Sequence, residues 1–89
     1  MNELAQLPNI GKVLAGQLEM AGISTPAQLK SVGSEDAFTR LATLDDSACV
    51  NMLYALEGAI QGIRWHQLPS ERKKELLEFF YFCKKQTNR

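Results

Sequence analysis

His66, Cys49 and Cys83 are the residues whose types could bind a metal ion or move a proton. A zinc site needs three or four protein ligands. With one histidine and two widely spaced cysteines, it would have to recruit carboxylates through the fold. General acid and base chemistry would pair His66 with Glu57 or Asp46, but no nucleophile motif, phosphate loop or carboxylate pair accompanies them. We therefore expect no enzyme, no metal, no cofactor and no small-molecule substrate, with His66 as a turn residue packed beside Trp65.

The segment Leu7-Pro8-Asn9-Ile10-Gly11-Lys12 interrupts the first helical stretch. It is similar to the helix-hairpin-helix pattern, with Asn9 where the first glycine is usual. Asparagine is the best substitute there because it tolerates a positive φ. The resemblance implies that backbone N–H groups at a helix N-terminus contact a DNA phosphate without reading sequence, and Lys12 adds a charge. The candidate nucleic-acid residues are Asn9, Ile10, Gly11 and Lys12. A compact turn with no ligand is the alternative.

Helical periodicity accounts for nearly every apolar residue, and no alternating run predicts a strand. We expect a single all-α domain over residues 1–89, with five or six short helices and a hairpin of the helix-hairpin-helix or SAM-like type. The expected helices follow a first turn at 2–6 and cover 11–21, 26–32, a segment from Ser34, 47–63 and 69–85. Thr25-Pro26-Ala27-Gln28 is a capping box with proline at the first helical position. Asp45-Asp46-Ser47 is expected to cap the central helix.

Charge is balanced overall, with ten basic and ten acidic residues in an 89-residue chain of 45% hydrophobic composition. This composition indicates a folded domain and excludes binding by bulk positive charge. Residues 34–64 sum to −3 (two basic, five acidic) and residues 65–89 to +3 (six basic, three acidic). Any nucleic-acid contact must therefore be local. No apolar run reaches the length of a membrane span, and both cysteines are interpreted as reduced core residues of a cytoplasmic protein.

Several segments together resemble the C-terminal domain of the TfoX/Sxy family. They are Leu7-Pro8-Asn9-Ile10-Gly11-Lys12, Ala21-Gly22-Ile23-Ser24-Thr25-Pro26 with Leu29, Val32-Gly33-Ser34 with Ala37-Phe38, Leu53-Tyr54-Ala55-Leu56-Glu57-Gly58-Ala59, and Gly62-Ile63-Arg64-Trp65-His66 with Leu68-Pro69. The match extends over about residues 4 to 77. The resemblance implies an all-helical fold and a link to regulation of natural competence in bacteria. Full-length members carry an additional N-terminal domain, to which nothing in these residues corresponds.

The last helix carries the aromatic run Phe79-Phe80-Tyr81-Phe82. At 100° per residue, Phe79 and Phe80 share one face, Tyr81 lies on a flank and Phe82 is nearly opposite. Exposed aromatic area among lysines indicates a protein interface, for which Phe79, Tyr81 and Phe82 are the candidates and a homodimer the simplest assembly. Wrapping of the helix on both sides is the alternative.

Two functions remain open at this point. The first is a non-enzymatic regulatory module that contacts double-stranded DNA, independently of sequence, through the hairpin. The second is a protein-interaction module that binds itself or another regulatory protein through the last helix. Trp65 is expected to fill the core with its N–H bonded to a backbone carbonyl. Tyr54 and Glu57, three apart on the central helix, are expected to make a buried hydrogen bond, with a surface shared within the family as the alternative.

Overall fold

The computed structural model describes residues 3–45 and 47–87, with the side chains of 85–87 outside the described set. Five α-helices and two 3-10 turns follow one another, and no strand occurs within these residues. The elements are η1 (Glu3–Gln6), α1 (Lys12–Met20), α2 (Pro26–Val32), α3 (Ser34–Leu44), α4 (Val50–Gln61), η2 (Trp65–Gln67) and α5 (Ser70–Thr87). The predicted all-α class is confirmed.

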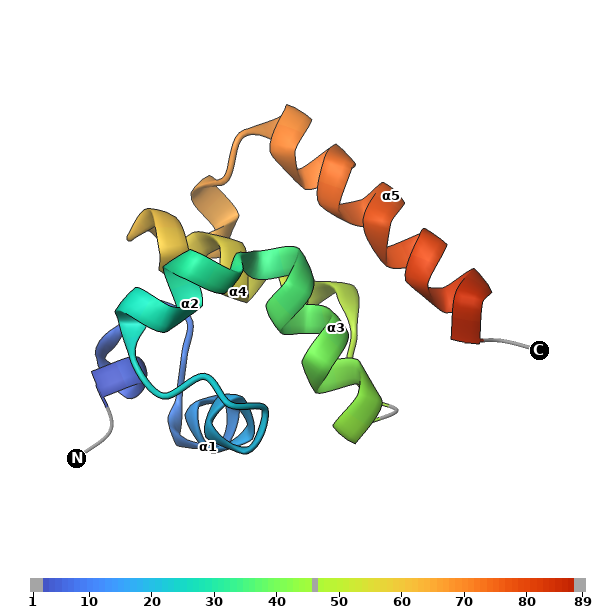
Figure 1. Cartoon of the computed structure of the whole chain (residues 1–89). Helices are drawn as coiled ribbons and strands as arrows, with labels where there is room; N and C mark the ends of the chain where they lie inside the picture. The colour runs from blue at the N-terminus through green and yellow to red at the C-terminus, as the bar shows by residue number, and fades with distance from the viewer. Residues whose placement is uncertain (1–2, 46, 88–89) are drawn as a thin grey trace.

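Helix α4 forms the centre of the molecule, because it packs against α3, α5, η2 and α2. Its mean hydropathy is the highest of the helices, and Leu53 and Leu56 are fully buried. Figure 1 shows α1 at one end and α5 running diagonally past α3 on the other side. The same core cluster contains buried leucines from five further elements; they are Leu4, Leu18, Leu29, Leu41 and Leu76.

Local capping signals place α2 where the sequence predicts it. The Thr25 hydroxyl accepts from Gln28 N at 3.1 Å, and Pro26 occupies the first turn, where its missing N–H has no helical partner anyway. Gln28 Oε1 accepts from Ser24 N at 2.6 Å, one residue earlier than a standard capping box. The predicted bounds, 26–32, are confirmed.

The predicted start of α4 is wrong by three residues. Asp45 does not cap it; instead its Oδ1 accepts from both N and Oγ of Ser47, at 2.9 and 2.6 Å. This local turn ends α3 and delays the next helix until Val50, with Cys49 at the N-cap. Asp46, the other expected cap residue, and Asn2, the expected start of the first turn, lie outside the described residues.

The prediction that both cysteines are core residues is wrong. Cys49 is exposed, since it stands at the start of α4 rather than inside it, and Cys83 is half-buried on α5. No disulfide joins them. Within the described ranges, no helix is long and apolar enough to cross a membrane.

Candidate nucleic-acid interface

The bend before α1 is built around Asn9, whose φ of 71° confirms the left-handed conformation predicted for this position. The amide side chain of Asn9 bonds to segments of the chain 46 to 56 residues away. Its Nδ2 donates to Ile63 O at 2.9 Å and more weakly to Ala55 O at 3.4 Å, while its Oδ1 accepts from Trp65 N at 3.1 Å. Asn9 therefore positions the bend rather than presenting its side chain to a ligand.

A glycine on α4 makes room for this contact. A Cβ at Gly58 would lie 2.6 Å from Asn9 Nδ2, 2.8 Å from Ile63 O and 3.2 Å from the Cα of Trp65. All three distances are below ordinary van der Waals contact, so only glycine lets the bend and the 63–65 loop meet over α4. The end of α4 is fixed as well, by Gly62 in the left-handed region with φ 76°.

The structure separates the four predicted DNA-contact residues into two pairs. Ile10 is 5% exposed, its side chain is part of the core, and its N–H donates to Leu7 O at 3.3 Å. Gly11 and Lys12 are exposed at the start of α1. Asn9 and Ile10 thus hold the bend from inside, and the outward surface consists of Gly11, Lys12 and the residues that follow them.

The first turn of α1 offers unpaired donors on that surface. Gly11 is the N-cap but supplies no side-chain acceptor. The amides of Lys12, Val13 and Leu14 bond to no backbone carbonyl of the described residues, and hydrogen bonding to the preceding chain resumes at Ala15. The arm before the bend is a 3-10 turn of four residues rather than an α-helix. A complete helix-hairpin-helix is therefore not confirmed, and only the bend and the helix that follows it are present.

An aromatic group lies directly beside the bend. Trp65 stacks on Tyr54 with ring centroids 5.7 Å apart and on His66 at 4.0 Å. Lys73 Nζ lies 5.6 Å from the indole centroid and donates to His66 O at 3.3 Å. Trp65 packs against the core as a half-buried residue rather than filling it. The predicted bond from its indole N–H to a backbone carbonyl is not among the hydrogen bonds of the described residues. His66 is a turn residue packed on Trp65, as predicted.

Glu57 is a buried carboxylate, 8% exposed, with three donors from three helices. It accepts from Ser34 Oγ at 2.6 Å, Gln61 Nε2 at 2.6 Å and Arg72 at 3.1 Å. Burial raises the pKa of Glu57, but the hydrogen bonds from Arg72, Ser34 and Gln61 outweigh it, so the pKa lies below its ordinary value of 4.5. The predicted buried hydrogen bond is confirmed, and the carboxylate serves to join α3, α4 and α5.

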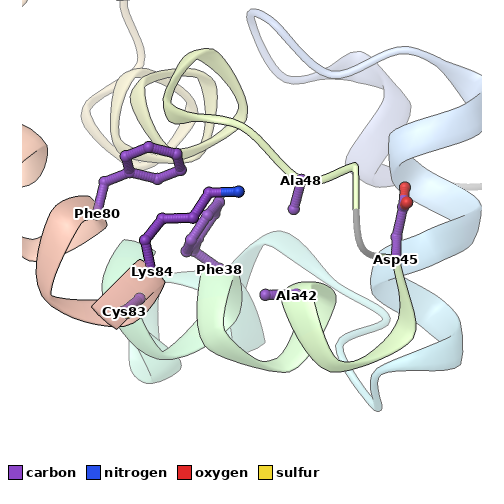
Figure 2. A pocket seen from close by; sticks show the side chains of 7 residues that line it. All are labelled: Phe38, Ala42, Asp45, Ala48, Phe80, Cys83 and Lys84. Atoms are coloured by element: carbon purple, nitrogen blue, oxygen red, sulfur yellow. The ribbon is translucent and has the colours of Figure 1, made fainter. Parts of the chain in front are cut away.

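The candidate interface residues on α5 differ in their surroundings. Phe79 packs against the core and is half-buried, whereas Tyr81 and Phe82 are each 58% exposed. On the inner flank of α5, Phe80 meets Phe38 edge to face at 5.8 Å. Figure 2 shows the residues around a small pocket beside this pair. Its volume is about 100 Å³. It is lined by Phe38, Ala42, Asp45, Ala48, Phe80, Cys83 and Lys84.

Sequence reasoning missed the distant partners in two groups of contacts. The Tyr54, Trp65, His66 and Lys73 contacts and the Glu57 network both join residues separated by many positions. A weak signal existed in each case, namely the single tryptophan followed by histidine and one carboxylate inside the most apolar helix. Neither signal identifies a partner. Among the described residues, no three histidine, cysteine, aspartate or glutamate side chains come together as metal ligands.

Comparison with known proteins places the chain in a family. Residues 1–80 match the TfoX C-terminal domain. Protein Sxy of Escherichia coli (strain K12) is 34% identical over 76 residues, which cover 85% of this chain and 36% of Sxy. The chain thus belongs to the TfoX C-terminal domain family, as its motifs predict, and it spans about a third of the length of Sxy.

Two crystal structures of Listeria monocytogenes proteins share the fold. One, an uncharacterized protein, is 51% identical with a TM-score of 0.88, covering 97% of this chain and 94% of its own. The other, a protein of unknown function, is 56% identical with a TM-score of 0.86, covering 89% of this chain and 96% of its own. These similarities agree with the helical arrangement described above.

Proposed function

We propose that the chain is a non-enzymatic regulatory module of the bacterial cytoplasm, linked to natural competence, which contacts DNA backbone through the first turn of α1. Membership in the TfoX C-terminal domain family supports the regulatory part of the proposal. The DNA contact depends on one observation above all: the unpaired amides of Lys12, Val13 and Leu14 accompany an exposed lysine. Backbone N–H groups at a helix start suit a phosphate and carry no sequence preference.

The rigidity of the bend favours phosphate binding by these amides. The Asn9 side chain holds it against the 63–65 loop with hydrogen bonds of 2.9 and 3.1 Å. Amides fixed in advance lose little conformational entropy when an anion binds. Because a single phosphate contact is weak, binding also needs neighbouring cations, and Arg64 is exposed in the loop that contacts the bend.

The test is a titration of labelled duplex DNA, followed by fluorescence anisotropy at several salt concentrations. Lys12→Glu should weaken binding and reduce the slope of log K against log salt by about 1. Lys30→Glu is the matched control, because it makes the same charge change at an exposed lysine of α2. No binding at about 50 mM salt, or equal losses in the two variants, would reject the DNA contact.

A second candidate function is self-association through α5. The observation that favours it is the exposure of Tyr81 and Phe82, at 58% each, on neighbouring positions of one helix. Aromatic side chains at the surface are typical of protein interfaces. Light scattering at submillimolar concentration should then show a dimer that Phe82→Glu dissociates. Met20→Glu, at a 76% exposed position of α1, is the control and should leave the dimer intact. A monomer at that concentration would contradict this candidate.

A further inference from the structure

The stack formed by Tyr54, Trp65 and His66 is the aromatic group next to the proposed DNA contact. His66, at one end of this group, is exposed, and its ring stacks on the indole with the two ring centroids 4.0 Å apart. A further flat ring can therefore continue the stack on His66. We propose that this stack binds unpaired bases of a nucleic-acid strand.

The charges around the stack fit the phosphates of such a strand. Lys73 lies over the indole at 5.6 Å, and Arg64 is exposed one residue before Trp65. The carboxylate of Glu57, three residues after Tyr54, does not compete for these cations, since it is buried and bonded to Ser34, Gln61 and Arg72. Aromatic rings with cations along one track are how proteins hold single strands without reading sequence.

The backbone that carries the stack is anchored at two points. Trp65 N donates to Asn9 Oδ1 at 3.1 Å, and Lys73 fastens the η2 turn by donating to His66 O at 3.3 Å. A ring that does not move on binding retains more of its stacking energy.

The start of α1 lies near the stack, because Asn9 accepts from Trp65 N. Lys12 follows Asn9 by three residues, which the backbone can span over at most about 11 Å. A strand whose phosphate lies on the first turn of α1 can thus place its next bases on His66. The inference deepens the proposed function and rests on it for the chemical class of the ligand. It adds that a single strand, or a duplex with an unpaired end, is bound better than a blunt duplex.

The experiment compares a labelled oligothymidine with a blunt duplex of equal length, using anisotropy and the fluorescence of Trp65, the only tryptophan. Single-strand binding should quench Trp65. His66→Ala should weaken it about tenfold, as expected for one lost base stack, and leave duplex binding unchanged. His66→Phe should keep single-strand binding, because it keeps a ring. Gln67→Ala, the next exposed residue of η2, is the matched control.

Each outcome bears on one proposal separately. If His66→Ala, with an unchanged circular dichroism spectrum, binds the oligothymidine as well as the unaltered chain does, the stack is not a base site, whatever the duplex result. Unchanged Trp65 fluorescence on binding would overturn the inference too. If the duplex is bound with dependence on Lys12 while the single strand is not preferred, the inference fails and the proposed function stands. If the single strand is preferred while duplex binding does not depend on Lys12, only the contact at α1 is rejected.

Discussion

Asn9 and Trp65 are 56 positions apart in the sequence, yet the backbone N–H of Trp65 donates to the side-chain oxygen of Asn9 at 3.1 Å. This bond brings the bend before α1 against the turn that follows α4. It also explains why asparagine suits a position where glycine would satisfy the backbone equally well. The residue supplies both the positive φ of 71° and the polar atoms that hold two segments together.

Replacing Asn9 separates these two roles. Asn9→Gly keeps the backbone conformation but removes the side-chain hydrogen bonds, so it should lower the free energy of unfolding by about 1–3 kcal/mol. Asn9→Ala should cost about 1 kcal/mol more, because alanine is strained at positive φ. Urea unfolding of both variants measures which of them loses more stability. A glycine variant as stable as the unaltered chain would show that the side-chain bonds contribute nothing.

The close approach at Gly58 gives a second prediction. Gly58→Ala places a methyl group 2.6 Å from Asn9 Nδ2 and 2.8 Å from Ile63 O. We expect a net loss of about 1–3 kcal/mol, despite the better helix propensity of alanine. Gly16→Ala in α1 is the control, since a Cβ there meets nothing within 4 Å. It should be neutral or stabilising by up to about 1 kcal/mol. Equal effects of the two changes would contradict this account.

The Glu57 network predicts a pH dependence of stability. A carboxylate whose pKa is lowered in the folded state stabilises it above the unfolded value, ordinarily 4.5, and this contribution disappears as the pH falls through the folded pKa. Glu57→Gln should therefore lower the free energy of unfolding by about 1.5–3 kcal/mol at neutral pH, the range for hydrogen bonds to a charged group. The gap should shrink as the pH drops below 4.5. Urea unfolding of both chains at several pH values tests this, and a constant gap would contradict it.

The two thiols should react at different rates. Cys49 is exposed at the start of α4, whereas burial raises the pKa of the half-buried Cys83, and the charge of Glu35 adds to this, against the opposing effect of a hydrogen bond with Thr39. Since the thiolate is the reactive species, Ellman's reagent should modify Cys49 first. In Cys49→Ser the fast phase should vanish, and in Cys83→Ser it should persist. A fast phase that survives Cys49→Ser would show that Cys83 is the accessible thiol.

Locally encoded features are the ones that the sequence predicts well. The capping of α2 by Thr25, Pro26 and Gln28 lies within four residues, and its bounds are correct. The predicted start of α4 is wrong because the Asp45 carboxylate can either cap a helix or stabilise a turn. It accepts from Ser47 N in a turn, and the helix begins later. Helical periodicity likewise places Phe82 on the exposed side of α5.

The contacts between distant segments could not be predicted in the same way. Trp65 next to Asn9, or Arg72 next to Glu57, depends on how α4 and α5 are joined, and periodicity says nothing about that. The hairpin residues illustrate the difference. Their pattern predicts a bend correctly, but only the structure shows that Asn9 and Ile10 turn inward while Gly11 and Lys12 remain outside.

Arg72 contacts three carboxylates at once, Glu35, Glu57 and Glu75, at 3.6, 3.1 and 3.0 Å. Loss of the guanidinium would leave the buried charge of Glu57 without its counterion, which few chains of this size tolerate. Positions 34, 57 and 72 should therefore vary as one group during evolution. Relatives that lack the arginine are expected to carry a neutral residue at position 57.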